Sequence, residues 1–374
     1  MRVVIIGAGV IGTSVAFRLA ERGTRTILIE EDRPGAGATG ASFAWLHARD
    51  KQPRAYHDLN VASMAAHAAL RSELGAVPWL HGGGALAWPV EDADVGRLRR
   101  WGYAVEEISR EAVLAREPGL AAAAMRDGPF AYFPDEAWLD AVVYVGAMLI
   151  RAKTLGAELR RDRVEDLLIE EGRVAGVRLA DGTTVPADAV VNCAGAWANT
   201  VVRDPSLHVP LRPTRSLLVV TPPVATGLSR VLHTPGVNLR PDGSGRLMLQ
   251  SDTTDAELAQ DNTQVDTAAS ASMLMDRARA LLPAIGGATA ETTRIGVRPV
   301  PADLLPALGP VPGVPGYHIA VTPNAVTLAA HIGRLMAVAV TDGRLPPALS
   351  PFAAARFFDG ESSPRTSDAS PSSS

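Results

Sequence analysis

A chain of 374 residues, 47% of them hydrophobic, is long for one hydrophobic core and suggests about two domains. Its net charge of −4 leaves no broad basic surface of the kind that binds nucleic acid. The single cysteine excludes an intrachain disulfide and a cysteine-rich metal site, and the histidines show no metal-ligand spacing, so we expect no metal.

The first predicted unit is a βαβ segment. Residues 2–6 are apolar and β-branched, a glycine-rich turn follows, and residues 10–22 are typical of a helix. A second apolar run, 26–29, ends in Glu30. An acid at this distance from a G-x-G-x-x-G turn is typical of the ribose ligand in a dinucleotide-binding fold.

The glycines of this turn have separate expected roles. Gly7 permits the tight turn, Gly9 lets the backbone approach a pyrophosphate, and Gly12 lets the helix lie close to the strand. The free N–H groups at the helix start, at Val10 and Ile11, would face the phosphates, where the helix dipole is positive. The alternative is a structural βαβ turn that binds nothing.

Helices and strands alternate along the next part of the chain. The loop 32–42 is rich in small residues and suits the close approach of a flat or charged ligand. We expect helices at 55–74, 92–101, 109–117 and 139–155, and strands at 85–88, 157–159 and 163–167. A hairpin is predicted at 174–185, and the apolar run 189–193 is typical of a central parallel strand.

The character of the chain changes after residue 210. Strands at 216–221 and 246–250, with turn residues 240–243 between them, are followed by a helix at 267–282. A strand at 317–321 and a helix from about 325 to 341 return to the first pattern. This order indicates a nucleotide-binding fold interrupted by a β-rich insertion.

Targeting signals are not evident in the sequence. No window reaches the apolar length of a membrane span, and the N-terminal apolar stretch is interpreted as a strand rather than a signal peptide. We therefore expect a cytoplasmic protein without an integral membrane segment. The Ser/Pro-rich tail, 359–374, is expected to be disordered.

Several motifs follow one another in a fixed order between about residues 2 and 358. They are 7–12 with Glu30, 37–42, 191–197, 239–243, 296–303 with Pro306 and 309–310, and the end of the closing helix at 333–335. In this order and spacing they resemble the D-amino-acid oxidase, glycine oxidase and sarcosine oxidase superfamily of flavoproteins.

The resemblance implies an α/β fold with two domains. A discontinuous, Rossmann-like FAD-binding domain is expected at 1–84, 139–210 and 292–358. An inserted antiparallel β-sheet domain of α+β type, at 85–138 and 211–291, would form a roof over the flavin and bind the substrate.

The resemblance also implies which residues hold FAD. The pyrophosphate would lie on the first helix, the ribose on Glu30 and the adenine against the backbone of Val164. The expected FAD-binding residues are Gly7, Gly9, Val10, Ile11, Gly12, Glu30, Glu31, Ala38, Thr39, Ser42, Val164, Ala194, Gly195, Trp197, Asn324, Ala325, Val326 and Thr327.

Two residues are expected at the substrate. Arg298 matches the arginine that pairs with the substrate carboxylate in amino-acid-oxidising members, a task that suits the guanidinium fork. The alternative is a structural arginine in a strand-to-loop turn. His47 would contact the flavin or move a proton, or else be a loop histidine with its own partner. Arg49, Tyr56 and Arg240 have weaker claims.

The expected reaction is the oxidation of a small amine or amino acid. No second dinucleotide motif follows residue 150, so electrons should come from an organic substrate rather than from NAD(P)H. A hydride would pass from the C–H next to nitrogen to flavin N5, and water would hydrolyse the resulting imine. FAD-dependent 2-hydroxy-acid oxidation remains an alternative, as does a flavin-carrying subunit or an NAD-binding protein without amine oxidation.

The last motif departs from many relatives. Pro323 has no N–H to donate, so Asn324 is expected to cap the closing helix while Ala325 and Val326 donate to the flavin. The helix N-terminus would then stabilise negative charge on the reduced ring.

The cysteine and lysine content bears on the cofactor and the electron acceptor. Cys193 falls on a predicted core strand, which predicts noncovalent FAD. Lys51 and Lys153 are the only lysines, and none lies in the C-terminal half, where sarcosine-oxidase-type members place one that favours reaction with O2. The acceptor, O2 or another molecule, therefore stays open, as does the oligomeric state.

Overall fold

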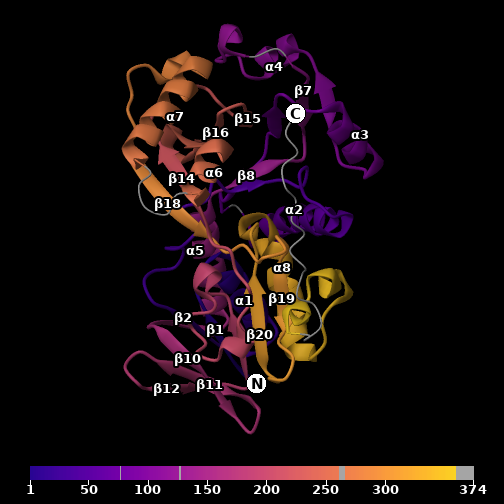
Figure 1. The fold of residues 1–374 in the computed structure, drawn as a ribbon, viewed down its shortest axis with the longest axis vertical. Helices are drawn as coiled ribbons and strands as arrows, with labels where there is room; N and C mark the ends of the chain where they lie inside the picture. Colours follow the sequence, from indigo (N-terminus) through magenta and orange to yellow (C-terminus); the bar gives the residue numbers. More distant parts are fainter. Residues whose placement is uncertain (76, 126–127, 261–265, 359–374) are drawn as a thin grey trace.

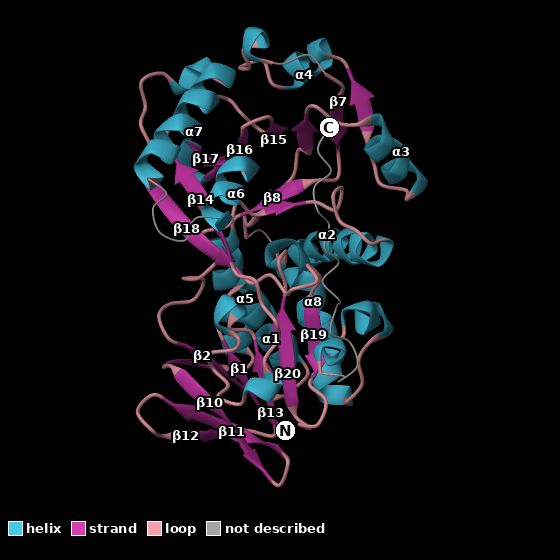
Figure 2. Cartoon of the chain, viewed as in Figure 1, coloured by secondary structure: helices cyan, strands magenta, loops and turns pink. Residues whose placement is uncertain are grey.

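The structure, a computed structural model, describes residues 1–75, 77–125, 128–260 and 266–358. The tail that we predict to be disordered, 359–374, lies outside them. The chain forms two units stacked along the long axis of the molecule, and each unit is built on its own main sheet (Figure 1). Helices cover the faces of both sheets (Figure 2).

The N-terminal unit is built on a six-stranded sheet. In sheet order its strands are β19 (Ala307–Pro310), β20 (Tyr317–Val321), β13 (Ala189–Asn192), β1 (Arg2–Ile6), β2 (Arg25–Glu30) and β9 (Glu158–Arg161). All neighbours run parallel except β19 and β20. Ile5 of β1 lies opposite Leu28 and Val191. Because helices and a small sheet cover its faces, the central strands are continuous apolar runs, as predicted for 189–193.

Four helices accompany this sheet: α1 (Val10–Glu21), α2 (Arg54–Leu74), α5 (Ala141–Thr154) and α8 (Ala325–Asp342). Helix α1 packs between α5 and α8, and α8 also packs on α2. Helix α5 begins later than predicted, because Leu139 ends a strand and the side chain of Asp140 accepts a hydrogen bond from the N–H of Val143.

Helix α8 corrects one prediction. With 18 residues and a mean hydropathy of 1.3 it is long and apolar enough to cross a membrane, although we predicted no such window. The apolar side chains have another explanation here, because 61% of the helix is buried inside the protein, against α1 and α2. A helix that is hydrophobic nearly all round is typical of the core of a large protein.

A small antiparallel sheet flanks the same unit. It consists of β10 (Val164–Glu170), β11 (Arg173–Leu179) and β12 (Thr184–Pro186). The predicted hairpin is confirmed, since Val177 pairs with Val185 across the turn at Asp181 and Gly182.

The second unit is built on an eight-stranded sheet. In sheet order its strands are β18 (Thr292–Arg298), β14 (Thr214–Val220), β17 (Arg246–Gln250), β16 (Val237–Asp242), β15 (Val231–Thr234), β5 (Ala85–Ala87), β7 (Phe130–Phe133) and β6 (Glu106–Ile108). The predicted antiparallel pairing holds except between β5 and β15, which run parallel with Ala85 opposite Val231. This pair joins the two inserted segments, 85–138 and 211–291, edge to edge.

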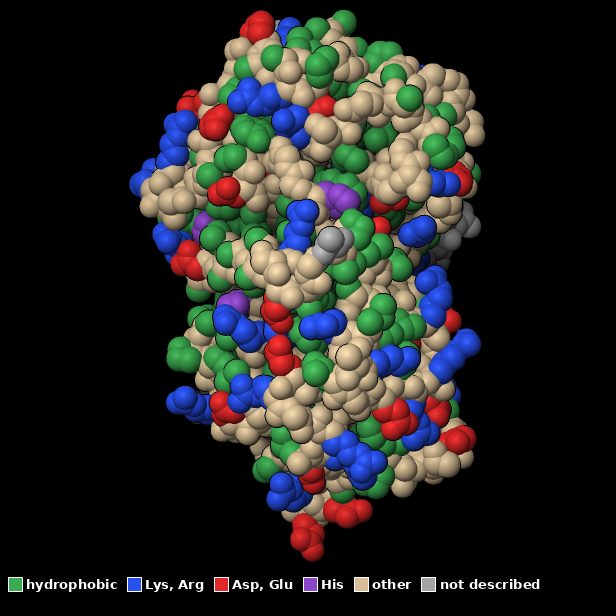
Figure 3. All heavy atoms as spheres, turned by 180° about the vertical axis from the view of Figure 1, so that it is seen from behind, with side chains coloured by type: hydrophobic (Ala, Val, Ile, Leu, Met, Phe, Trp, Pro, Cys, Tyr) green, Lys and Arg blue, Asp and Glu red, His purple; other side chains and the backbone are tan. Residues whose placement is uncertain are grey.

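The remaining elements lie around this second sheet. Its helices are α3 (Asp92–Arg100), α4 (Arg110–Arg116), α6 (Asp252–Gln260) and α7 (Thr267–Leu281). A three-stranded sheet of β3 (Trp45–Leu46), β8 (Ala137–Leu139) and β4 (Leu80–His81) lies where the two units meet. On the face seen in Figure 3, Lys/Arg and Asp/Glu side chains are interspersed over both units.

Two details of the insertion differ from the prediction. Residues 240–242 belong to strand β16, and the turn lies at Gly243–Gly245, where Ser244 has φ +64°. Strand β18, which the predicted boundary at 292 assigns to the FAD-binding domain, instead pairs with β14 in the eight-stranded sheet. The domain boundaries otherwise stay predictions.

The contact between α1 and α8 is testable at Gly333. A Cβ there would lie 2.6 Å from Cβ of Ser14 and 2.9 Å from its backbone carbon, so Gly333→Ala must push the two helices apart. We expect a loss of about 1–3 kcal/mol in the free energy of unfolding, seen as a lower melting temperature.

Gly146→Ala is the matched control in helix α5. Its added Cβ would meet nothing within 4 Å, and alanine favours a helix over glycine by about 0.5–1 kcal/mol. Equal melting temperatures for the two variants would contradict the close approach of α1 and α8.

Candidate active site

A cavity of about 1320 Å³ lies between the two units. One end is bounded by the glycine-rich turn, the end of β2 and the loop 36–45. The middle is bounded by residues 193–197 and the start of α8, and the other end by the underside of the eight-stranded sheet. The cavity therefore takes its walls from segments far apart in the sequence.

The glycine-rich turn forms a cradle that side chains would fill. Gly7 has φ +95°, and a Cβ there would lie 2.7 Å from the carbonyl oxygen of Cys193. A Cβ on Gly12 would lie 1.9 Å from the carbonyl oxygen of Gly7, so the predicted close packing of helix on strand is confirmed. Gly9, at the N-cap position of α1, has no side chain to cap the helix, and the first turn of α1 holds no acidic residue. Its positive end therefore faces the cavity and suits an anion.

Glu30 joins the second strand to this turn. Its Oε2 accepts a hydrogen bond from the N–H of Ala8 at 2.8 Å, and its Oε1 accepts one from the N–H of Asp32 at 3.1 Å. Thr39 approaches from the following loop, where its Oγ1 accepts from the N–H of Val10 at 3.2 Å. The carboxylate of Glu30 is thus fixed at the cavity wall, in a position to bind the ribose of the cofactor.

The structure brings most of the predicted FAD-binding residues to this one cavity. Those that line it are Gly7, Gly9, Val10, Ile11, Glu30, Glu31, Ala38, Thr39, Ser42, Val164, Ala194, Gly195, Trp197, Asn324, Ala325 and Val326. Gly12 and Thr327 do not line it. Gly12 packs on Gly7, and Thr327 is buried with its hydroxyl donating to the carbonyl of Trp45 at 3.3 Å.

The start of α8 is held by neighbours other than the predicted cap. Asn324 is at the N-cap position, but its side chain makes no capping hydrogen bond because its Nδ2 donates to Asn60. The ring of His67 lies 3.0 Å from the carbonyl oxygen of Val326, and burial lowers the pKa of this histidine to about 4. The neutral ring therefore donates from Nε2 to this carbonyl and holds the first turn of α8 in place.

Cys193 lies directly after β13 and lines the cavity beside the glycine-rich turn. This is the pyrophosphate end in the predicted arrangement, away from the eight-stranded sheet. Burial raises the pKa of its thiol well above the ordinary value. A neutral thiol at that end agrees with noncovalent binding, which stays a prediction.

The far end of the cavity is a chamber lined by polar and aromatic side chains, which we call the substrate chamber. Its walls include Trp45, His47, Arg49, Lys51, Phe133, His233, Gln250, Asp252, Asp255 and Arg298. The loop after β3 supplies one side of it, and the strands β15, β17 and β18 supply the roof.

Two neutral imidazoles flank Trp45 in this chamber. The ring of His47 stacks on Trp45 with centroids 4.0 Å apart, and that of His233 lies 5.5 Å away on a tilted plane. Burial, helped by Lys51, lowers the pKa of His47 to about 4. Burial, helped by Arg49, lowers the pKa of His233 to about 3. Both rings are therefore uncharged at neutral pH.

Arg298 ends β18 and is exposed to the chamber. Neither an ion pair nor a hydrogen bond of its guanidinium exists among the residues that the structure describes. The alternative of a structural arginine is thus disfavoured, because such a side chain would bond the loop around it.

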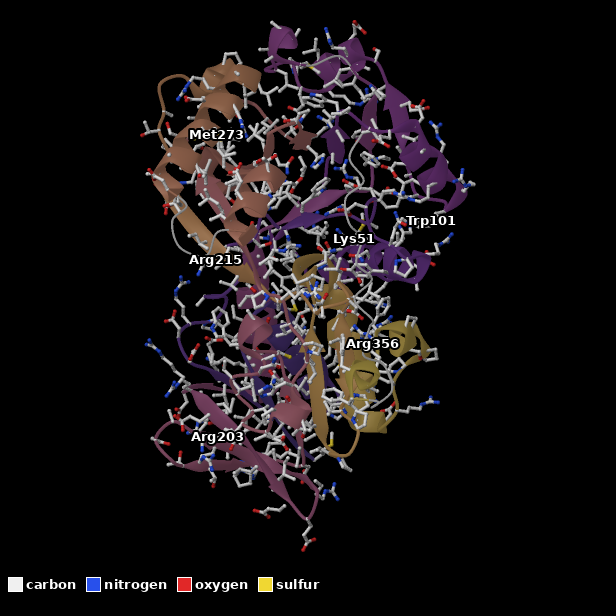
Figure 4. All side chains as sticks on the ribbon, in the orientation of Figure 1. Lys51, Trp101, Arg203, Arg215, Met273 and Arg356 are labelled. Carbon is white, nitrogen blue, oxygen red and sulfur yellow. The ribbon has the colours of Figure 1, made fainter. Side chains whose placement is uncertain are left out.

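Lys51 is a residue that sequence reasoning missed. It lies between the two units, at the level of α2 (Figure 4), and lines the chamber with its Nζ 2.7 Å from Oδ1 of Asp50. We considered a lysine near the flavin only in the C-terminal half, where this chain has none. The one available signal was its position four residues after His47 in the same loop.

Two weaker predictions do not hold for the site. Tyr56 is buried and does not line the cavity, and neither does Arg240. Arg240 is buried on β16, where its Nε donates to the carbonyl of Phe43 and its guanidinium lies 4.6 Å from the ring of Trp138. Its Nη1 also donates to the carbonyl of Pro241 and pairs with Asp242 at 3.2 Å, just before the turn. Arg240 therefore holds the loop that leads into Trp45 and the end of β16 at this turn, rather than a substrate.

Glu136 is a buried acid behind the chamber. It is 1% exposed, accepts a hydrogen bond from the hydroxyl of Tyr103 at 2.9 Å, and has no partner for Oε2 in the described part of the chain. Burial raises the pKa of its carboxyl to about 7, although the nearby Arg49 lowers it. Its charge therefore changes in the physiological range.

Comparisons with known proteins agree with this geometry. The family model described as FAD dependent oxidoreductase matches residues 2–339. A glycine oxidase from Geobacillus kaustophilus is 27% identical, over 95% of this chain and 97% of that protein. The hydrogen cyanide synthase subunit HcnC from Pseudomonas aeruginosa is 25% identical, over 95% of this chain and 96% of that protein.

A solved structure is similar over the same length. The crystal structure of iminodiacetate oxidase from Chelativorans sp. BNC1 has a TM-score of 0.80 and 25% identity, covering 94% of this chain and 98% of that one. These findings confirm the resemblance and the FAD cofactor that the motifs predict. The glycine cradle, the two helix N-termini and the long cavity fit that cofactor.

The role of Glu30 is testable by cofactor retention. Glu30→Ala removes the acceptor of the Ala8 N–H and the expected ribose ligand, so we expect FAD to dissociate at least about tenfold more readily. The flavin-to-protein absorbance ratio after dialysis measures this. Glu158→Ala, an exposed acid on the adjacent strand β9, should retain its flavin. Equal retention in both variants would remove Glu30 from this role.

The buried acid Glu136 predicts a pH dependence of stability. Between pH 4.5 and about 7 the unfolded chain loses the proton of this carboxyl while the folded chain keeps it. Wild-type stability should therefore fall, relative to Glu136→Gln, by about 3 kcal/mol as the pH rises through this window. Melting temperatures of both proteins from pH 4.5 to 8 measure the difference, and a difference independent of pH would contradict the shifted pKa.

Proposed function

We propose, from the premise that this chain belongs to the FAD-dependent oxidoreductase family, that it oxidises the C–N bond of a small amine or amino acid. Bound FAD supplies the two-electron acceptor. The observation that carries the proposal is the unpaired guanidinium of Arg298, which shares one cavity with the FAD cradle and with two neutral imidazoles.

The named relatives support this choice of substrate class. A glycine oxidase and an iminodiacetate oxidase both act, by their names, on small amino compounds that carry a carboxylate. A free guanidinium at the chamber wall suits such a substrate, because it can donate two parallel hydrogen bonds to one carboxylate. Arg298 would then orient the carbon next to nitrogen toward the FAD cradle.

The neutral histidines provide a place for the proton. Oxidation removes a hydride from the carbon and a proton from the nitrogen of the substrate, leaving a C=N bond. Nδ1 of His233 has no hydrogen-bond partner in the described chain, and Nδ1 of His47 lies 3.2 Å from Oδ1 of Asp50, so these rings could relay that proton away from the substrate. Water then adds to the C=N bond and gives a carbonyl compound and ammonia or an amine.

Aromatic walls limit water at the reacting carbon. Trp45 and Phe133 are buried behind the chamber surface and line it with apolar faces. A less aqueous chamber strengthens the charge pairing between Arg298 and a carboxylate.

The names of the two oxidases support O2 as the electron acceptor.

The proposal is tested by anaerobic reduction of the bound flavin. The holoenzyme is mixed with D- and L-amino acids, N-methylglycine and 2-hydroxy acids, and the visible flavin absorbance is followed. We expect bleaching by amino compounds only, with release of a carbonyl product and ammonia or an amine, and of H2O2 when air is admitted. Bleaching by hydroxy acids alone, or by no compound in the panel, would refute C–N oxidation.

The role of Arg298 is tested by Arg298→Gln. Loss of a charge-assisted pair of about 2–3 kcal/mol should raise KM for a carboxylate-bearing amine about 30- to 150-fold. Arg215→Gln is the matched control, because Arg215 lies on the neighbouring strand β14, opposite Val297, and is exposed (Figure 4). An unchanged KM in Arg298→Gln would exclude the carboxylate role.

A further inference from the structure

Two arginine side chains of the substrate chamber have no partner among the described residues. Arg49 and Arg298 both line it, and neither guanidinium forms an ion pair or a hydrogen bond in the part of the chain that the structure describes. The other cations of this wall are engaged. Lys51 lies 2.7 Å from Asp50, and Arg97 pairs with Asp94 at 2.5 Å. Two guanidiniums are therefore left to face the chamber.

Arg49 is held in place without using its hydrogen-bond donors. Its guanidinium carbon lies 4.6 Å from the ring centroid of Trp45 and 5.2 Å from that of Phe133. Its backbone carbonyl accepts a hydrogen bond from Arg97 at 3.2 Å. Aromatic contacts engage the flat faces of a guanidinium and leave its N–H edge unbonded. The guanidinium of Arg49 is therefore held in position, while its N–H groups have no hydrogen-bond acceptor in the described part of the chain.

The acids near the chamber are bonded to their own neighbours. Asp255 accepts from the hydroxyl of Ser216 at 2.6 Å, from Gln250 at 2.8 Å and from the N–H of Leu217 at 3.0 Å. Gln250 also donates to Asp252 at 3.1 Å. These acids therefore join α6 to the roof, and neither forms an ion pair with Arg49 or Arg298 in the described part of the chain.

Other titratable groups near Arg49 do not neutralise it either. Glu136 lies close enough to affect Arg49, but burial raises the pKa of that carboxyl to about 7, and no ion pair joins the two. The nearby rings of His47 and His233 are uncharged at neutral pH. A partly enclosed guanidinium without an acceptor is unfavourable, so a ligand that brings one would be stabilised.

We propose that the substrate carries two carboxylates, one bound by Arg298 and the other by Arg49. This inference rests on the proposed function, since it names the substrate class of the same chamber: an amino- or imino-dicarboxylate. Arg298 would take the carboxylate next to the oxidised carbon, and Arg49 would select for the second one. A substrate with a single carboxylate would leave the second guanidinium unpaired.

The first test measures binding to the holoenzyme without turnover. The probes are two thioethers: thiodiacetate, with two carboxylates, and (methylthio)acetate, CH3–S–CH2–COO−, with one. Neither has an amine nitrogen, and perturbation of the flavin spectrum or calorimetry gives each Kd. We expect the wild type to bind the diacid at least about 30-fold more tightly. Arg49→Gln should reduce this preference to about threefold or less, and Arg49→Lys should restore part of it by keeping the charge.

The second test measures turnover of matched substrates. The pairs are iminodiacetate with N-methylglycine and aspartate with alanine. Arg49→Gln should lower kcat/KM for the dicarboxylate of each pair at least about tenfold and change that of the monocarboxylate by less than about threefold. Arg54→Gln is the control, because Arg54 is a surface arginine of α2, paired with Asp58, and its loss should leave the ratio unchanged.

The outcomes separate this inference from the proposed function. Equal wild-type binding of the two thioethers, or equal losses for both members of each substrate pair in Arg49→Gln, overturns the dicarboxylate inference while amine oxidation stands. Loss of flavin from folded Arg49→Gln and Arg49→Lys assigns Arg49 to the cofactor and also overturns it. An Arg49-dependent preference for thiodiacetate in a protein that oxidises no amine supports the two-carboxylate site and rejects C–N oxidation.

Discussion

The architecture depends on the close approach of three backbone segments. Gly7 lies against Cys193 at the end of β13, Gly12 lets α1 lie against the turn at Gly7, and Gly333 lets α8 lie against α1 at Ser14. A side chain at any of these glycines would meet backbone atoms at less than 3 Å. Because α1 and α8 pack together, their N-termini open on one cavity, and two partial positive charges point into it. The FAD site follows from this packing.

The substrate chamber depends on the meeting of two sheets. The loop after β3 brings His47 and Arg49 from the first unit, while β15 and β18 bring His233 and Arg298 from the second. Partial enclosure gives these groups their chemistry. It keeps both imidazoles uncharged at neutral pH, and it makes a guanidinium without an acceptor a strong site for an anion.

The sequence pattern agrees best with the structure where a feature depends only on residues close together in the chain. The glycine spacing, the acid at Glu30 and the hairpin at 174–185 each depend on backbone geometry over a few residues, and the structure has them as predicted. The predictions fail where a side chain bonds a residue far away in the sequence. Asn324 bonds Asn60 instead of capping α8, and Arg240 bonds Phe43 and does not line the cavity where a substrate would bind.

By itself the sequence determined the βαβ start, the family and FAD as cofactor, because a glycine turn, an apolar strand and a spaced acid are local requirements of dinucleotide binding. Only the tertiary structure decided which charged groups face the substrate. Lys51, Arg49 and Arg298 are all cations in the sequence, yet packing pairs the first with Asp50 and leaves the other two without a partner in the part of the chain that the structure describes. Charge pairing depends on distances across the fold, which no local pattern contains.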